Sequence, residues 1–267
     1  MIKEFIPPVL LNFMTGLRFG WQGNYQTWAE AKGKCSGYDS ALIFNKVRDA
    51  VMSVKNGKAV FERDSVLFDK VQYSFPLLSS LALIALSEKG KLNVLDFGGS
   101  LGSSYFQNRS LFSELQEFNW CVVEQEHFVD EGQRNFSDDH LHFYFDMKSC
   151  LAERSINTIL FGSVLQYIED PYALLDEAMA TKTAYIMIDR TPVMLNGNDR
   201  ITIQKVPKKI YDASYPSRIM SERKLLDLLQ TKYELIYDSI SPERINVRNA
   251  ALKGYFLRRK PKSAVSS

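Results

Sequence analysis

The stretch Leu92-Asn-Val-Leu-Asp-Phe-Gly-Gly-Ser-Leu-Gly102 decides the fold class of this chain. Its first half is an apolar burst interrupted by Asn93 and Asp96, and its second half is rich in glycine. This pattern predicts a buried strand that runs into a tight turn. Apolar residues at helical spacing follow over 103–117, so the turn is expected to lead into a helix whose free N–H groups point back at it.

The chain downstream repeats this alternation of strand and helix. Four more buried strands are predicted, at 120–123, 141–145, 156–161 and 184–188. Two last strands, 233–237 and 254–258, are expected to pair antiparallel at the sheet edge. Such alternation favours a parallel sheet with helices on both faces. We therefore predict an α/β fold: a Rossmann-like, doubly wound, mainly parallel seven-stranded sheet with an N-terminal helical extension.

The chain is expected to divide into three segments. Residues 1–90 show mostly helical spacing and form the extension, residues 91–260 form the Rossmann-like domain, and residues 261–267 form a loose tail. Residues 191–220 are polar and rich in turn residues, so we expect a loop there. Polar side chains inside the extension suggest a lid over a ligand, and the alternative is a helical layer over one sheet face. These side chains are Asn24, Tyr25, Asp39, Arg63, Asp64, Tyr73 and Ser74.

The first residues of the chain leave two interpretations open. Ile2–Leu17 is largely apolar, and Pro7 and Pro8 favour a helix start there. An amphipathic helix could pack on the protein body or rest on a membrane surface, which would place the protein at the inner face of the membrane. No segment reaches the ~20 apolar residues that span a bilayer. Three widely spaced cysteines favour a reducing cytoplasm over a disulfide framework.

Polar or glycine-rich residues follow most of the predicted parallel strands. They are Asp96–Gly102, Glu124, Gly162–Ser163 and Asp189. In open α/β sheets a ligand binds beyond these carboxyl ends, so the pattern favours a nucleotide cofactor. A dinucleotide fingerprint counted from Gly98 needs glycines at 100 and 103, where this chain has serines. The lysine that ends a P-loop is also absent.

The glycine turn resembles the first motif of class I S-adenosylmethionine-dependent methyltransferases. Val94–Gly102 matches this motif, with Ser100 in place of the middle glycine, a change that is tolerated if this position needs no unusual φ. Residues 159–171 are similar to the fourth motif. The resemblance implies S-adenosylmethionine as cofactor, with Glu124 on the ribose hydroxyls and Asp146 near the adenine. Asp146 could equally be a solvated loop acid. The implied cofactor-binding residues are Asp96, Phe97, Gly98, Gly99, Ser100, Leu101, Gly102, Glu124, Gln125, Asp146, Phe161, Gly162 and Ser163.

A closer resemblance covers the chain from about Trp21 to about Arg258. Several runs are similar to a family of bacterial methyltransferases associated with surface-polysaccharide (O-antigen) biosynthesis. These runs are Trp21–Tyr25, Gly37–Asp39, Glu62–Ser65, Tyr73–Ser74, Asp96–Arg109 and Val123–Gln125. The resemblance implies methyl transfer to a small-molecule or saccharide acceptor.

Three residues are candidate catalytic bases, since a hydroxyl acceptor would have to lose a proton. They are Asp189, Tyr167 and Asp64. Tyr167 could equally be a half-buried core aromatic, and Asp189 could simply pair with Arg190. The histidines and cysteines show no metal-ligand spacing, so no metal site is predicted.

A basic cluster follows the fifth predicted strand. It contains Lys205, Lys208, Lys209, Arg218, Arg223 and Lys224. The cluster could be a solvated face or a site for a phosphate-bearing sugar. Nucleic-acid binding is not expected, because the net charge is only +2 and no recognition motif is present. Two alternatives to a methyltransferase stay open: a non-catalytic adenosylmethionine-binding protein and an NAD-dependent sugar-modifying enzyme.

Overall fold

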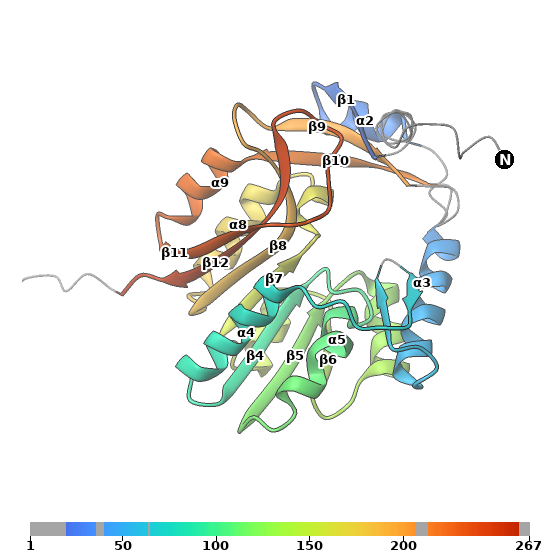
Figure 1. The fold of residues 1–267 in the computed structure, drawn as a ribbon, viewed down its shortest axis with the longest axis vertical. Helices are drawn as coiled ribbons and strands as arrows, with labels where there is room; N and C mark the ends of the chain where they lie inside the picture. The colour runs from blue at the N-terminus through green and yellow to red at the C-terminus, as the bar shows by residue number, and fades with distance from the viewer. Residues whose placement is uncertain (1–19, 36–39, 64, 207–212, 262–267) are drawn as a thin grey trace, which may run out of the picture.

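A mixed sheet organises the protein. The computed structural model describes residues 20–35, 40–63, 65–206 and 213–261, and ten of the strands there share one sheet (Figure 1). Seven strands form a row in the order β6 (Leu141–Tyr144), β5 (Glu117–Val123), β4 (Lys91–Phe97), β7 (Thr158–Gly162), β8 (Tyr185–Met194), β12 (Ala250–Arg259) and β11 (Tyr233–Ile240). The first five are parallel, and β12 is antiparallel to both neighbours. This row confirms the predicted doubly wound α/β class and its antiparallel edge pair.

The sheet continues beyond the seven predicted strands. The first half of the long strand β8 pairs with β7, and its end pairs with β10 (Ser214–Ser221) through Val193 and Met220. From β10 the sheet continues antiparallel through β9 (Arg200–Lys205) to β1 (Gly20–Tyr25). The prediction of a loop at 191–220 is therefore wrong. The strand β1 is also an exception to the mostly helical structure that was expected for residues 1–90. Local patterns miss these strands because pairing between distant parts of the chain stabilises them.

Helices cover both faces of the sheet. Strand β4 shows why, because its fully buried residues alternate between two separate clusters. Leu92 and Val94 join the cluster that includes α4 (Phe75–Ser87) and α5 (Ser103–Phe112). Leu95 joins the other cluster, which includes α7 (Met147–Glu153), α8 (Pro171–Ala180) and α9 (Glu222–Leu229). With both faces buried, the carboxyl edge of the parallel strands remains as the place for a ligand.

Three helices of the sheet layers begin at residues whose side chains favour a helix start. Asp170 caps α8 by accepting a hydrogen bond from the Ala173 N–H at 3.1 Å. Ser221 caps α9 by accepting one from the Lys224 N–H at 3.5 Å, and Pro76 lies in the first turn of α4. The remaining α-helices of the described chain are α2 (Trp28–Gly33), α3 (Ser40–Lys55) and α6 (Glu126–Glu131).

A small hairpin interrupts the N-terminal region that was expected to be mostly helical. Strands β2 (Phe61–Arg63) and β3 (Val66–Phe68) pair antiparallel, and β2 packs against α3 and α5. This correction matters for function, because the hairpin reaches the carboxyl edge of β4 (Figure 1).

Several expectations concern residues outside the described ranges. They are the helix at Ile2–Leu17, the side chains Asp39, Asp64, Lys208 and Lys209, and the tail at 262–267. Within the described ranges, no helix has the length and apolar character needed to cross a membrane.

Candidate functional site

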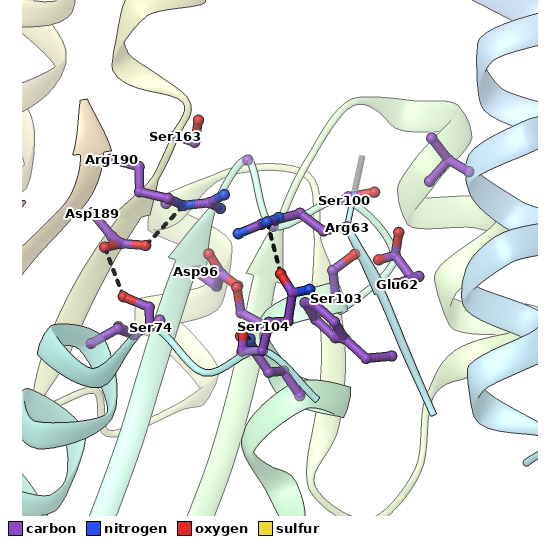
Figure 2. A pocket seen from close by; sticks show the side chains of 18 of the residues that line it. Glu62, Arg63, Ser74, Asp96, Ser100, Ser103, Ser104, Ser163, Asp189 and Arg190 are labelled. Atoms are coloured by element: carbon purple, nitrogen blue, oxygen red, sulfur yellow. Dashed lines mark hydrogen bonds and ion pairs between the residues drawn. The ribbon is translucent and has the colours of Figure 1, made fainter. Parts of the chain in front are cut away.

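Two neighbouring cavities lie at the carboxyl ends of the parallel strands. The smaller one has a volume of about 220 Å³ and lies beside β4, β7 and β8 (Figure 2). The larger one has a volume of about 1190 Å³ and lies beyond β4, β5, β6 and β7. Gly98, Ser100, Ser163 and Tyr167 line both cavities. The predicted turn after β4 therefore stands at the junction of the two cavities.

The backbone conformation and the close packing of this turn explain why it contains three glycines. Gly98 has φ +72°, and a Cβ there would lie 2.3 Å from Cγ2 of Val164. Gly102 has φ +89°. A Cβ at Gly99 would lie 2.6 Å from the carboxyl group of Asp96. These positions therefore need glycine for conformation or for space.

Ser100 differs from the expectation for the middle position. Its φ is +56°, so this position does need the left-handed conformation, and the serine adopts it at a cost in backbone strain. The condition under which serine would be tolerated without cost is therefore not met.

Asp96 forms part of the small cavity and is almost fully buried, with 1% of its surface exposed. One carboxylate oxygen accepts a hydrogen bond from Nε1 of Trp120 at 2.9 Å. Burial raises the pKa of Asp96 to about 7, although the Trp120 hydrogen bond acts in the opposite direction. The carboxyl group can therefore gain or lose a proton near neutral pH.

Glu124 and Asp146 both line the large cavity, and backbone N–H groups donate hydrogen bonds to both carboxylates. Burial raises the pKa of Glu124, against the hydrogen bonds from the Gln125 and Ser100 N–H groups. Asp146 caps α7 by accepting the Ser149 N–H at 2.7 Å, and this bond lowers its pKa. The α7 cap thus occupies one oxygen of Asp146.

The large cavity combines these carboxylates with apolar walls. Apolar residues come from the ends of β4 and β5, from the loops after β6 and β7, and from α7 and α8; they include Phe97, Val123, Phe145, Met147, Val164, Ile168 and Leu174. Three residues of the predicted cofactor set line neither cavity, because they are buried beneath the site: Leu101, Gly102 and Phe161.

Asp189 lines the small cavity, but it does not end its strand as expected. It lies in the middle of β8, which continues to Met194 because β10 and β12 pair with its second half. Its carboxylate accepts hydrogen bonds from Oγ of Ser74 and from Nε of Arg190, both at 3.2 Å (Figure 2). The expected pair with Arg190 is thus present inside the cavity.

Tyr167 stands at the junction of the cavities and is 40% exposed. Its hydroxyl donates a hydrogen bond to Oε1 of Gln204 at 2.7 Å. Its ring meets that of Tyr215 edge-on, with the centroids 5.9 Å apart. The strands of the sheet extension therefore position this side chain.

Backbone strain gathers at the small cavity. Of the seven described non-glycine residues with positive φ, four line it: Ser65, Ser100, Ser163 and Arg190. Such conformations persist where surrounding structure enforces them, and they cluster at functional sites. Gln166 enforces the one at Ser163, because its buried Nε2 donates to the Ser163 backbone oxygen at 2.8 Å and Oγ at 3.0 Å. This clustering marks the cavity as a candidate functional site.

The N-terminal region contributes one wall of the small cavity. Of the side chains expected to form a lid, Arg63 and Ser74 line this cavity, whereas Asn24, Tyr25 and Tyr73 line neither cavity.

Sequence reasoning did not single out several other lining residues as site residues. They are Glu62, Gln72 and Gln107 in the small cavity and Trp28, Lys32 and Tyr215 in the large one. Glu62 carried two signals in the sequence: it lies in the run Glu62–Ser65 that supports the closer resemblance, and it begins a charged stretch, Glu62-Arg63-Asp64, between apolar residues.

The basic cluster after β8 does not form a ligand site in the described structure. Lys205, Arg218, Arg223 and Lys224 line neither of the two cavities. Arg218 instead pairs with Asp199 at 3.2 Å, and Lys224 approaches the same carboxylate at 4.0 Å. The phosphate-site hypothesis for these residues is therefore not supported.

Comparison with known proteins finds similarity in solved structures. No family model and no curated protein matches the sequence. The N-terminal domain of EvdMO1, solved in the presence of S-adenosylhomocysteine (SAH) and D-fucose, is 14% identical to this chain. The match covers 84% of this chain and 97% of that domain, with a TM-score of 0.48.

Magnesium protoporphyrin IX methyltransferase from Synechocystis PCC 6803, solved with S-adenosylmethionine (SAM), is 13% identical to this chain. The match covers 81% of this chain and 97% of that chain, with a TM-score of 0.45.

A third similar structure is the 1,6-didemethyltoxoflavin-N1-methyltransferase of Burkholderia thailandensis, solved with 1,6-didemethyltoxoflavin and SAH. It is 15% identical over 85% of this chain and 91% of that chain, with a TM-score of 0.43.

Proposed function

We propose that this protein is a SAM-dependent methyltransferase that acts on a small-molecule acceptor. The observation that carries the proposal is the pair of cavities that meet at the Gly98–Ser100 turn, with Glu124 at the end of the neighbouring strand. A carboxylate suits the two hydroxyls of a ribose, and the apolar walls suit an adenine. The small cavity offers charges of both signs, which an α-amino acid end requires.

The residues of the chain would divide the work between binding and alignment. When bound, SAM supplies an electrophilic methyl group: the carbon–sulfur bond breaks as the acceptor nucleophile bonds to carbon, which leaves SAH. The cofactor-binding residues proposed from the sequence keep their roles, except Leu101, Gly102 and Phe161, which support the site from below. Alignment and exclusion of water are then the main contributions of the protein.

A hydroxyl acceptor would also have to lose a proton. Asp189 and Tyr167 line the small cavity and remain the proposed bases, and Asp64 remains a candidate from the sequence. Asp189 is the better placed, because Ser74 and Arg190 hold its carboxylate at the cavity wall. We further propose a saccharide as the acceptor, a choice that rests on the sequence resemblance. The three cysteines are free, which supports a reducing compartment such as the cytoplasm.

Calorimetric titration with SAM, SAH and NAD tests the proposal. We expect SAM and SAH to bind and Glu124→Gln to weaken both about 10- to 100-fold, since charge-assisted hydrogen bonds to the ribose are lost. Glu126→Gln, at an exposed neighbouring carboxylate, is the matched control and should leave both affinities unchanged. Binding of NAD without SAM or SAH would refute the proposal. Binding of SAM with no turnover across a panel of saccharides and other small acceptors would favour the non-catalytic alternative.

A further inference from the structure

Two arginines face the small cavity from different parts of the chain. Arg63 comes from the β2–β3 hairpin and Arg190 from β8, and Figure 2 shows their side chains extending toward each other above Asp96. Nε of Arg190 is bonded to Asp189, but its two Nη groups have no hydrogen-bond partner among the described residues. Two guanidinium groups therefore border the cavity beside the glycine turn, together with the carboxyl groups of Glu62, Asp96 and Asp189.

The guanidinium of Arg63 is held from three sides. Its Nη2 donates to Oε1 of Gln72 at 3.2 Å, and the group lies 5.9 Å from the ring centroid of Phe68. Its Nη1 donates to Oε1 of Glu243 at 3.1 Å. The first two contacts come from near Arg63 in the chain and fix its direction. The third comes from the segment between β11 and β12, far away in sequence.

Glu243 lies within the field of both arginines. Burial acts to raise its pKa, but the Ser241 hydroxyl and the charges of Arg190 and Arg63 outweigh burial, so the pKa is lowered. Glu243 does not line the cavity itself, and its side chain is 39% exposed. A partly exposed ion pair contributes little to stability, so Glu243 can leave Arg63 for water at low cost.

The small cavity matches the amino-acid end of the cofactor in size and charge. The large cavity, at about 1190 Å³, has the room for an adenosine, and the small one, at about 220 Å³, has the room for the smaller amino-acid end. Arginine is the residue best suited to bind a carboxylate through two parallel hydrogen bonds. The first turn of α5 also contributes Ser103 and Ser104, whose free N–H groups add to the positive potential.

We propose that Arg63 binds the carboxylate of the cofactor's amino-acid end, and that Glu243 holds this position in the free protein. The proposal rests on the proposed function. Binding then exchanges one carboxylate for another on Arg63, and it releases Glu243 toward solvent. Arg63 is a cofactor-binding residue in this scheme, and Glu243 is an internal competitor.

The proposal predicts opposite effects on SAH affinity for substitutions at Arg63 and at Glu243. Calorimetric titrations with SAH and with 5′-methylthioadenosine measure these effects. The second compound keeps the adenosine and the sulfur but lacks the amino-acid end. Arg63→Met should weaken SAH about 10- to 100-fold and leave 5′-methylthioadenosine within about twofold of wild type. Glu243→Gln should tighten SAH about three- to tenfold and leave 5′-methylthioadenosine unchanged. Arg48→Met, at an arginine of α3 that lines neither cavity, should change neither affinity.

Each other outcome has a definite meaning. Failure of the wild type to bind SAH would refute the proposed function itself. If wild type binds SAH but Arg63→Met weakens both ligands equally, or neither, the carboxylate assignment is wrong. If Glu243→Gln does not raise the affinity for SAH, the role of Glu243 as an internal competitor is wrong. Because Glu243→Gln alters a half-exposed side chain outside the core, it tests the exchange even if Arg63→Met does not fold.

Discussion

The buried carboxyl group of Asp96 should make the stability of this protein depend on pH. Burial raises its pKa from the ordinary value of 3.8 to about 7. Between these values the folded protein holds a proton that the unfolded chain has lost, so stability falls as pH rises from about 4 to about 7 and levels off above. At 1.36 kcal/mol per pH unit, the cost of the ionised group at pH 8 is about 4 kcal/mol. At pH 5 the folded group is still protonated, and the loss of unfolding free energy relative to low pH is about 1.5 kcal/mol.

Asp96→Asn removes this cost while keeping an oxygen that can accept the Trp120 hydrogen bond. The variant should exceed wild type in unfolding free energy by about 4 kcal/mol at pH 8, and by about 1.5 kcal/mol at pH 5. Urea unfolding followed by tryptophan fluorescence at constant ionic strength, from pH 5 to pH 8, measures the gap. Asp176→Asn, at an exposed site on α8, is the matched control. A gap that does not change with pH, or a variant less stable than wild type at pH 8, would refute the reasoning.

The remaining predictions concern the glycine turn. Ser100→Gly should stabilise the protein by about 0.5–1 kcal/mol, because glycine adopts φ +56° without strain; a loss of stability in urea unfolding would contradict this. Gly98→Ala should cost more than about 2 kcal/mol, because its Cβ would lie 2.3 Å from Cγ2 of Val164. Adding Val164→Ala to Gly98→Ala should recover part of that loss beyond the sum of the single effects, and strict additivity in a double-mutant cycle would show that the contact is not the cause.

The sequence alone determined the central parallel strands and the turn between β4 and α5. Each of these strands is a short apolar run buried on both faces, and each follows or precedes a helix with its own start signal, such as Asp170-Pro171. Such signals are local, so they are legible without knowledge of the fold. The same holds for Gly98 and Gly102, whose positive φ is required by a tight turn.

Only the tertiary structure decided the extent of the sheet and the composition of the small cavity. Strand β1 exists because it pairs with β9, and Asp189 lies inside β8 because β10 and β12 extend that strand. Arg63 meets Glu243 only because a hairpin near one end of the chain and a loop near the other reach the same sheet edge. These contacts join residues that are distant in sequence, and each gains its stability from the partner. No local pattern of charge or hydrophobicity can therefore reveal them.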